Sequence, residues 1–104
     1  MRLAWRAERP LKRLYTFFVH LVGPDGQLVA QHDRPPEGGF YPTTAWDPGE
    51  VVQDTYVLEV PKDVLPGVYR LIAGAYWLPA GERLRAADGS DAVELTTLVV
   101  TDDE

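Results

Sequence analysis

The chain has 104 residues, of which 45% are hydrophobic, 25% charged and 11% aromatic, a composition typical of one globular domain with a single core. Sixteen acidic against ten basic residues give a net charge of −6, which opposes sequence-independent binding to nucleic acid. The absence of cysteine excludes disulfides, thiolate metal sites and cysteine catalysis. Residues 1–104 are therefore predicted to form one domain without a nucleic-acid partner.

The first predicted strand lies at the start of the chain. Leu3, Trp5 and Ala7 alternate with more polar neighbours, which is the period of a strand with one face on a core. Because this alternation begins at residue 2, we expect the chain either to be a fragment of a larger protein or to lack a preceding N-terminal strand.

A hairpin is predicted to follow. Residues 14–22 are rich in aromatic and β-branched side chains, with Phe17, Val19 and Leu21 on one face and Thr16, Phe18 and His20 on the other. The turn-forming residues 23–26 then predict that residues 28–32 return as the partner strand.

Further strands are predicted after a long loop at residues 34–50. They cover residues 51–60, 68–78 and a closing segment that ends near residue 99, and residues 83–85 are expected to pair briefly. The residues predicted to face the core are Tyr56, Leu58 and Val60, then Tyr69, Leu71, Ala73, Ala75 and Trp77, and finally Val93, Leu95, Thr97 and Val99. Asp54 shares the inward parity of its strand, so its carboxylate is expected to have a partner.

The order of these elements predicts the fold class. Apolar residues recur at a spacing of two rather than three and four, and Pro or Gly interrupts the longer stretches, which disfavours helices of more than a turn or two. Short strands at a spacing of eight to twelve residues favour an all-β, immunoglobulin-like antiparallel β-sandwich of about seven strands.

Several phrases in a fixed order resemble a known family. They are Phe18-Val19-His20-Leu21-Val22 with Pro24-Asp25-Gly26, Gln31-His32-Asp33-x-Pro35-Pro36, Gly39-x-Tyr41-Pro42-Thr43, Trp46-x-Pro48-Gly49-Glu50 and Leu65-Pro66-Gly67-x-Tyr69-Arg70-Leu71. This set, which spans residues 5–100, resembles the C-terminal β-sandwich of bacterial multi-pass membrane glycosyltransferases related to protein mannosyltransferases. The resemblance implies an extracytoplasmic, membrane-associated domain beside the membrane-embedded catalytic domain of its parent chain, with no catalytic residues of its own.

The candidate ligand-binding residues lie just before the long loop and within it, and they are His32, Asp33, Tyr41, Trp46 and Asp47. Aromatic faces beside carboxylates suit sugars, because ring C–H groups stack on the aromatic face while carboxylates accept hydroxyl hydrogen bonds. In the alternative interpretation Tyr41 and Trp46 hold the loop against the end of the core, and Asp33 and Asp54 accept hydrogen bonds from loop amides.

Catalytic and metal sites are not expected. Ser90 is the only serine and lies outside a Gly-x-Ser-x-Gly sequence, and the acids around the loop have the spacing of neither a zinc motif nor a calcium loop. No catalytic residue, metal ligand or cofactor is therefore predicted.

Basic residues gather in the first third of the chain. Arg2, Arg6, Arg9, Lys12, Arg13 and Arg34 outnumber the acids Glu8, Asp25 and Asp33 there, while the remainder is strongly acidic. A basic edge could contact lipid headgroups or the acidic face of a neighbouring domain, or it could be a solvated edge that discourages strand-to-strand aggregation.

Two functions from different classes follow. The first is a non-catalytic accessory domain attached to a membrane glycosyltransferase-like protein. The second is a carbohydrate-binding module that uses the 34–50 loop, with a glycan as its partner.

Overall fold

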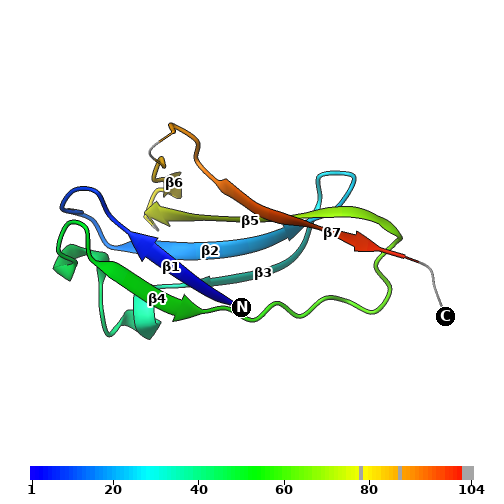
Figure 1. Ribbon diagram of the computed structural model, residues 1–104, viewed down its shortest axis with the longest axis horizontal. Coiled ribbons are helices and arrows are strands. Elements are labelled where there is room, and N and C mark those ends of the chain that lie inside the picture. Colours follow the sequence, from blue (N-terminus) through cyan, green and yellow to red (C-terminus); the bar gives the residue numbers. More distant parts are fainter. Residues whose placement is uncertain (78, 87, 102–104) are drawn as a thin grey trace.

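The computed structural model describes residues 1–101 with the exception of residues 78 and 87. Within these residues, seven strands form two antiparallel sheets that pack as a sandwich (Figure 1), which confirms the predicted fold class. The strands are β1 (Arg2–Arg6), β2 (Tyr15–Val22), β3 (Leu28–Arg34), β4 (Val51–Thr55), β5 (Gly67–Trp77), β6 (Glu82–Arg83) and β7 (Val93–Val100), and the long loop contains the 3-10 turns η1 (Pro36–Gly39) and η2 (Thr43–Ala45).

The two sheets differ in size. The larger one has the order β3-β2-β5, and both β6 and β7 pair with the remaining edge of β5. The smaller sheet consists of β1 and β4, paired from Arg2↔Thr55 to Arg6↔Val51. It packs over β2, where the Trp5 and Phe17 rings have centroids 4.4 Å apart. Figure 1 shows β1 and β4 on one side of the molecule, while β7 extends beyond them.

The core lies between the sheets and uses the residues that the alternation predicts. Phe17, Val19 and Leu21 of β2 are at most 3% exposed, and the inner residues of β5 from Tyr69 to Ala75 are at most 7% exposed. Removing a large apolar side chain from water stabilises the fold by roughly 1.5–3 kcal/mol, so this layer supplies much of the driving force for folding. Trp77 is only half-buried, and the Arg13 guanidinium lies 4.1 Å from its ring centroid. Leu78, which ends the predicted strand, lies outside the described residues.

The predicted strand 51–60 is too long, because β4 ends at Thr55. Its partner β1 begins at Arg2, and the ladder closes with the Met1 and Tyr56 backbones, which bond each other in both directions. Beyond that point no strand remains to pair with the chain within the described residues, and the Val57 N–H donates to His32 instead. Tyr56 is fully buried as predicted, whereas Val60 is 47% exposed and its predicted inward orientation is wrong.

The predicted inner face of β7 is also wrong in part. A bulge opposite Leu71 and Ile72 inserts one residue into β7, so Thr96 pairs with Leu71 and Glu94 with Ile72. Paired residues point to the same face, and the extra residue therefore reverses the parity along the rest of the strand. Thr97 and Val99 lie on the outer face, and Val99 is 70% exposed.

A small cluster of rings around Phe18 lies on the outer face of the larger sheet. Phe18, which the alternation places on this face, is only 1% exposed. The His20 ring lies 4.4 Å from it, the Tyr76 ring 6.1 Å, and the Arg83 guanidinium 4.6 Å. Gly74 lies directly under this ring, because a Cβ built there would be 2.6 Å from Phe18 Cζ.

Replacing Gly74 with alanine is expected to lower the free energy of unfolding by about 1–3 kcal/mol, because the added methyl collides with a buried ring that has little room to move. Urea unfolding measures the loss. Phe18→Leu removes the two ring atoms that come closest and leaves only the Asp91 carbonyl oxygen, 3.1 Å away, so adding Gly74→Ala to Phe18→Leu should cost less than adding it to the natural chain. Equal costs in the two backgrounds would contradict the packing explanation.

Candidate functional site

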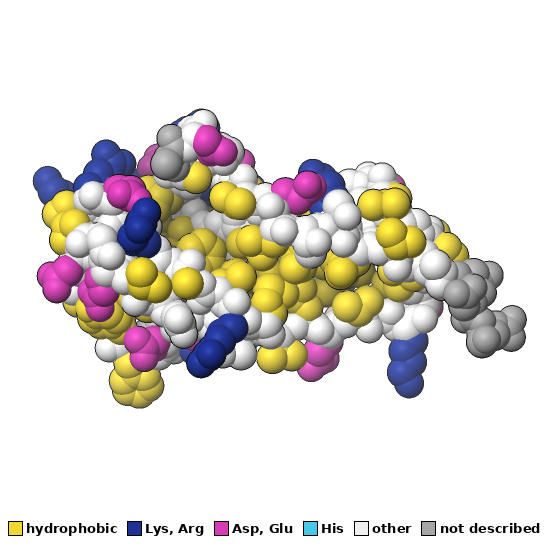
Figure 2. Space-filling view, in the orientation of Figure 1, with side chains coloured by type: hydrophobic (Ala, Val, Ile, Leu, Met, Phe, Trp, Pro, Cys, Tyr) yellow, Lys and Arg dark blue, Asp and Glu magenta, His cyan; other side chains and the backbone are white. Residues whose placement is uncertain are grey.

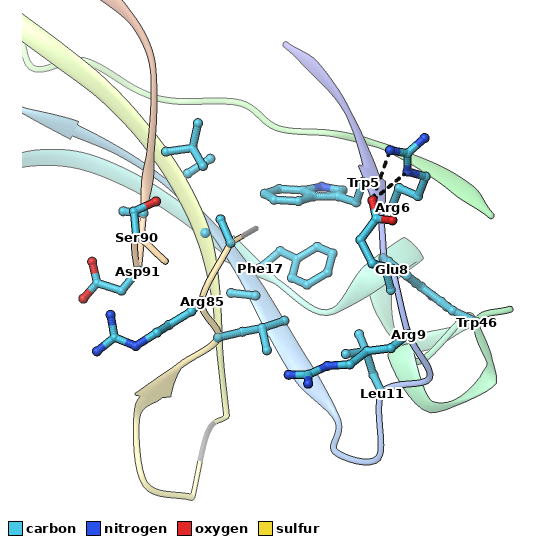
Figure 3. A pocket seen from close by; sticks show the side chains of 18 residues that line it. Trp5, Arg6, Glu8, Arg9, Leu11, Phe17, Trp46, Arg85, Ser90 and Asp91 are labelled. Carbon is cyan, nitrogen blue, oxygen red and sulfur yellow. Dashed lines mark hydrogen bonds and ion pairs between the residues drawn. The ribbon is translucent and has the colours of Figure 1, made fainter. Parts of the chain in front are cut away.

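A groove of about 420 Å³ lies on the side where the sandwich is open. Trp5 at the end of β1 and Val93 at the start of β7 line its two walls, while Phe17, Ala73 and Ala75 of the larger sheet are also among its lining residues. Figure 3 shows the Trp5 and Phe17 side chains directed into this space. Figure 2 shows that apolar side chains form a band along this face of the molecule.

The groove exists because both sheets have a free edge there. Within the part of the chain that the structure describes, β1 pairs only with β4 and β7 only with β5. The smaller sheet therefore stops short of the β5–β7 half of the larger sheet, and nothing described covers Val93 or Leu98, which are 45% and 44% exposed. An apolar strand edge left open in this way is a site where another strand can add.

The overall dimensions agree with an incompletely covered fold. A compact monomer of this mass exposes about 5,800 Å², whereas the accessible surface of this chain is 6961 Å². Its radius of gyration is 15.0 Å, against about 13 Å for a compact domain of this length. The chain thus exposes roughly 1,000 Å² more than a compact monomer of its mass.

Arginines gather at one end of the groove. Arg6 pairs with Glu8 at 3.0 Å, and the Arg85 guanidinium donates to the Gly89 carbonyl at 2.8 Å. A second hollow beside this end is lined by Arg9, Arg13, Arg83 and Arg85 together with Glu82 and Asp91, among other residues. Four arginines and two acids line this second hollow, where Arg13 pairs with Glu82 at 2.8 Å and Arg83 lies 3.8 Å from Asp91.

The residues predicted to bind a ligand do not form one cluster. His32 and Asp33 are neighbours on β3, so their side chains point to opposite faces of the larger sheet. His32 Nδ1 accepts a hydrogen bond from the Val57 N–H at 2.9 Å, next to the Tyr56 ring. Asp33 lies on the outer face.

Tyr41, Trp46 and Asp47 remain together in the loop. The Tyr41 hydroxyl lies 2.7 and 2.8 Å from the two carboxylate oxygens of Glu50, and the Asp47 N–H donates to the same carboxylate at 3.0 Å. Trp46 is 5% exposed, stacks edge-on against Phe17, and donates its indole N–H to the Tyr41 carbonyl. The loop is therefore held against the end of the core by the aromatic residues, and the sugar-binding hypothesis stays a prediction.

The contact between Tyr41 and Glu50 shifts both pKa values. The hydrogen bond to the carboxylate raises the pKa of Tyr41 from 10.0 to about 12, and the same bond, with the Asp47 N–H, lowers the pKa of Glu50 below 4.5. A carboxyl whose pKa is lowered by folding stabilises the fold at pH values above its pKa in the unfolded chain. This contribution is lost as the pH falls through its pKa in the folded chain.

Tyr41→Phe should therefore raise the pKa of Glu50 toward 4.5, measured by carbon-detected NMR of the carboxyl groups during an acid titration. Asp88 is an internal control, because hydrogen bonds from Ser90 lower its pKa independently of the loop. An unchanged pKa of Glu50 would show that the Tyr41 hydroxyl does not bond the carboxylate in solution.

The structure also joins three residues that the sequence left apart. Asp33 accepts a hydrogen bond from the Tyr76 hydroxyl at 2.9 Å, and its other oxygen lies 3.2 Å from His20 Nε2. Burial raises the pKa of Tyr76, and the hydrogen bond to Asp33 acts in the same direction. The three residues come from β2, β3 and β5 and meet because these strands are neighbours, a fact that local alternation does not reveal.

Asp54 has the partner that its inward parity predicts. Its carboxylate lies 3.3 Å from Arg34 Nε and accepts the Glu37 N–H at 2.8 Å, and its side chain is 8% exposed. This contact ties β4 to the start of the long loop. Phe40, at the tip of the same loop, is 93% exposed.

Among the described residues, no group of three His, Asp or Glu side chains is placed to hold a metal ion. In the same part of the chain, no helix has the length and hydropathy needed to span a membrane. No protein-family model, curated protein or solved structure matches the chain.

Proposed function

We propose that this chain is a non-catalytic interaction domain whose binding surface is the open side of the sandwich, and that it serves as an accessory domain of a membrane glycosyltransferase-type protein. The observation that carries the proposal is the apolar groove of about 420 Å³ between the free edges of β1 and β7. Exposed apolar surface of this kind marks interaction sites.

The polar clusters favour binding over catalysis. Tyr41 and Asp47 share the Glu50 carboxylate, and Asp33 links His20 to Tyr76. In both clusters the polar atoms bond one another, an arrangement that holds loops and strands in place. None of these six residues lines the groove, so none of them is placed to act on a molecule bound there.

The accessory role rests on the sequence resemblance, and the open side suits it. A domain attached to a larger protein can leave one face unfinished, because the neighbouring part of the assembly covers that face permanently. Extracytoplasmic location and the glycosyltransferase-type partner belong to the same proposal.

Photocrosslinking in the cells that make the protein tests it. A benzoylphenylalanine in place of Val93, which lines the groove, should form a light-dependent crosslink to a segment of a glycosyltransferase-type membrane protein, either in the same chain or in another, and mass spectrometry of the crosslinked peptides identifies that segment. Val57 is 64% exposed and does not line the groove, so the same substitution there is the matched control. An adduct from neither position, or equally from both, would contradict the proposal.

A further inference from the structure

We propose that the open side is closed by an extended strand of a partner chain, which pairs with the free edge of β1, covers the apolar groove and presents Asp or Glu side chains to Arg2 and Arg6. This inference rests on the proposed function and names the chemistry of the partner.

The backbone of β1 has one edge available. The N–H and C=O groups of Met1 both bond Tyr56. Because hydrogen-bonded pairs alternate along an antiparallel ladder, Leu3 and Trp5 also direct their N–H and C=O groups toward β4. The N–H and C=O groups of Arg2, Ala4 and Arg6 therefore point to the other edge. Figure 1 shows that this edge of β1 faces the β5–β7 half of the larger sheet.

The inward side chains of an added strand would meet an apolar floor. A strand beside β1 would lie in the groove lined by Ala73, Ala75 and Val93, and Ala73 and Val93 are themselves cross-strand partners. The alanine side chains are small, and the groove above this floor has a volume of about 420 Å³. Covering this floor would also bury part of the surface that this chain exposes beyond that of a compact monomer of its mass.

The outward side chains would meet positive charge. Arg2 and Arg6 project from β1 toward solvent, and the Arg6 side chain is 58% exposed even though it contacts Glu8. They are four residues apart, so acids four residues apart on a neighbouring strand can lie opposite both. Pairing of β1 with β1 of a second copy, centred on Ala4, would instead place Arg2 opposite Arg6 at both ends, and directly opposed like charges destabilise a sheet.

A synthetic peptide provides the probe. The sequence acetyl-Thr-Val-Glu-Val-Ser-Val-Glu-Val-Thr-amide has valines on one face and two glutamates with the required spacing on the other. Its control has lysine in place of both glutamates. Titration into the nitrogen-15-labelled chain should shift the backbone amide signals of Arg2, Ala4 and Arg6 and the indole N–H signal of Trp5, with the lysine peptide binding about tenfold more weakly.

Charge reversal on the protein makes the test specific. In Arg2→Glu/Arg6→Glu the preference should invert, with the lysine peptide binding about tenfold more tightly than the glutamate peptide. Both side chains point to solvent, and the variant should keep the natural amide spectrum outside β1.

The remaining outcomes overturn the inference in distinguishable ways. Equal binding of both peptides at the groove would reject the acidic partner while leaving the open side as the binding surface. Shifts in the peptide-free chain that grow with its own concentration would identify a second copy as the occupant. Absence of shifts along β1 with either peptide would reject strand addition, and the Val93 crosslink would then decide separately whether the proposed function stands.

Discussion

Replacing Phe17 with alanine is expected to lower the free energy of unfolding by about 3–5 kcal/mol. The ring is 3% exposed and lies between the sheets, 4.4 Å from the Trp5 ring and 5.4 Å from the Trp46 ring. The truncation removes apolar burial and leaves a gap between Trp5 of β1 and Trp46 of the long loop. These rings are held from different elements, so the surroundings cannot collapse onto the gap without moving a sheet.

Urea unfolding followed by tryptophan fluorescence measures this loss. Phe40→Ala is the matched control, because it deletes the same atoms from a side chain that is 93% exposed and should change stability by less than about 0.5 kcal/mol. Similar losses for the two variants would mean that Phe17 is not packed between the sheets.

Thr43→Val should lower the free energy of unfolding by about 2–3 kcal/mol, although the two side chains have nearly the same shape. Thr43 is completely buried, and its hydroxyl accepts the Tyr15 N–H at 3.0 Å and donates to the Arg13 carbonyl at 2.7 Å. Valine offers neither interaction, so a donor and an acceptor at the start of β2 lose their partner. The long loop would then lose both hydrogen bonds that join Thr43 to the chain at the start of β2.

Two further variants separate this hydrogen bonding from packing. Thr43→Ser keeps the hydroxyl and removes one methyl group, which should cost only about 1 kcal/mol. Thr44→Val makes the same substitution at the neighbouring, exposed position and should leave the free energy of unfolding almost unchanged. If Thr43→Ser proved as harmful as Thr43→Val, the loss would come from packing and the hydrogen-bond explanation would be wrong.

Much of the candidate site depends on contacts that no local pattern contains. Alternation placed Trp5 and Phe17 on inner faces, and the spacing of the strands indicated a sandwich. Neither pattern reveals that the smaller sheet has only two strands among the described residues and leaves the β5–β7 half of the larger sheet uncovered. The groove follows from which strands pair, and pairing partners are separated by half of the chain or more, as Arg2 and Thr55 or Tyr15 and Trp77 show.

The predictions that failed have the same origin. The bulge in β7 turns Thr97 and Val99 to the outer face. It arises from how β7 pairs with β5, and the alternation within β7 does not indicate it. Val60 continues an alternating pattern past the point where β1 can pair with it. In both cases a period of two describes which residues could share a face, while the neighbouring strand decides where the ladder shifts or ends.

The sequence by itself determined the strand-rich class of this protein, the inner faces of β2 and β5, and the need of Asp54 for a partner. These depend on side-chain alternation and on the cost of burying a charge, which are properties of short segments. The tertiary structure decided the open side, the parity of β7 and the meeting of His20, Asp33 and Tyr76. Each of these requires segments distant in the sequence to lie side by side, and their positions are set by the packing of the whole chain.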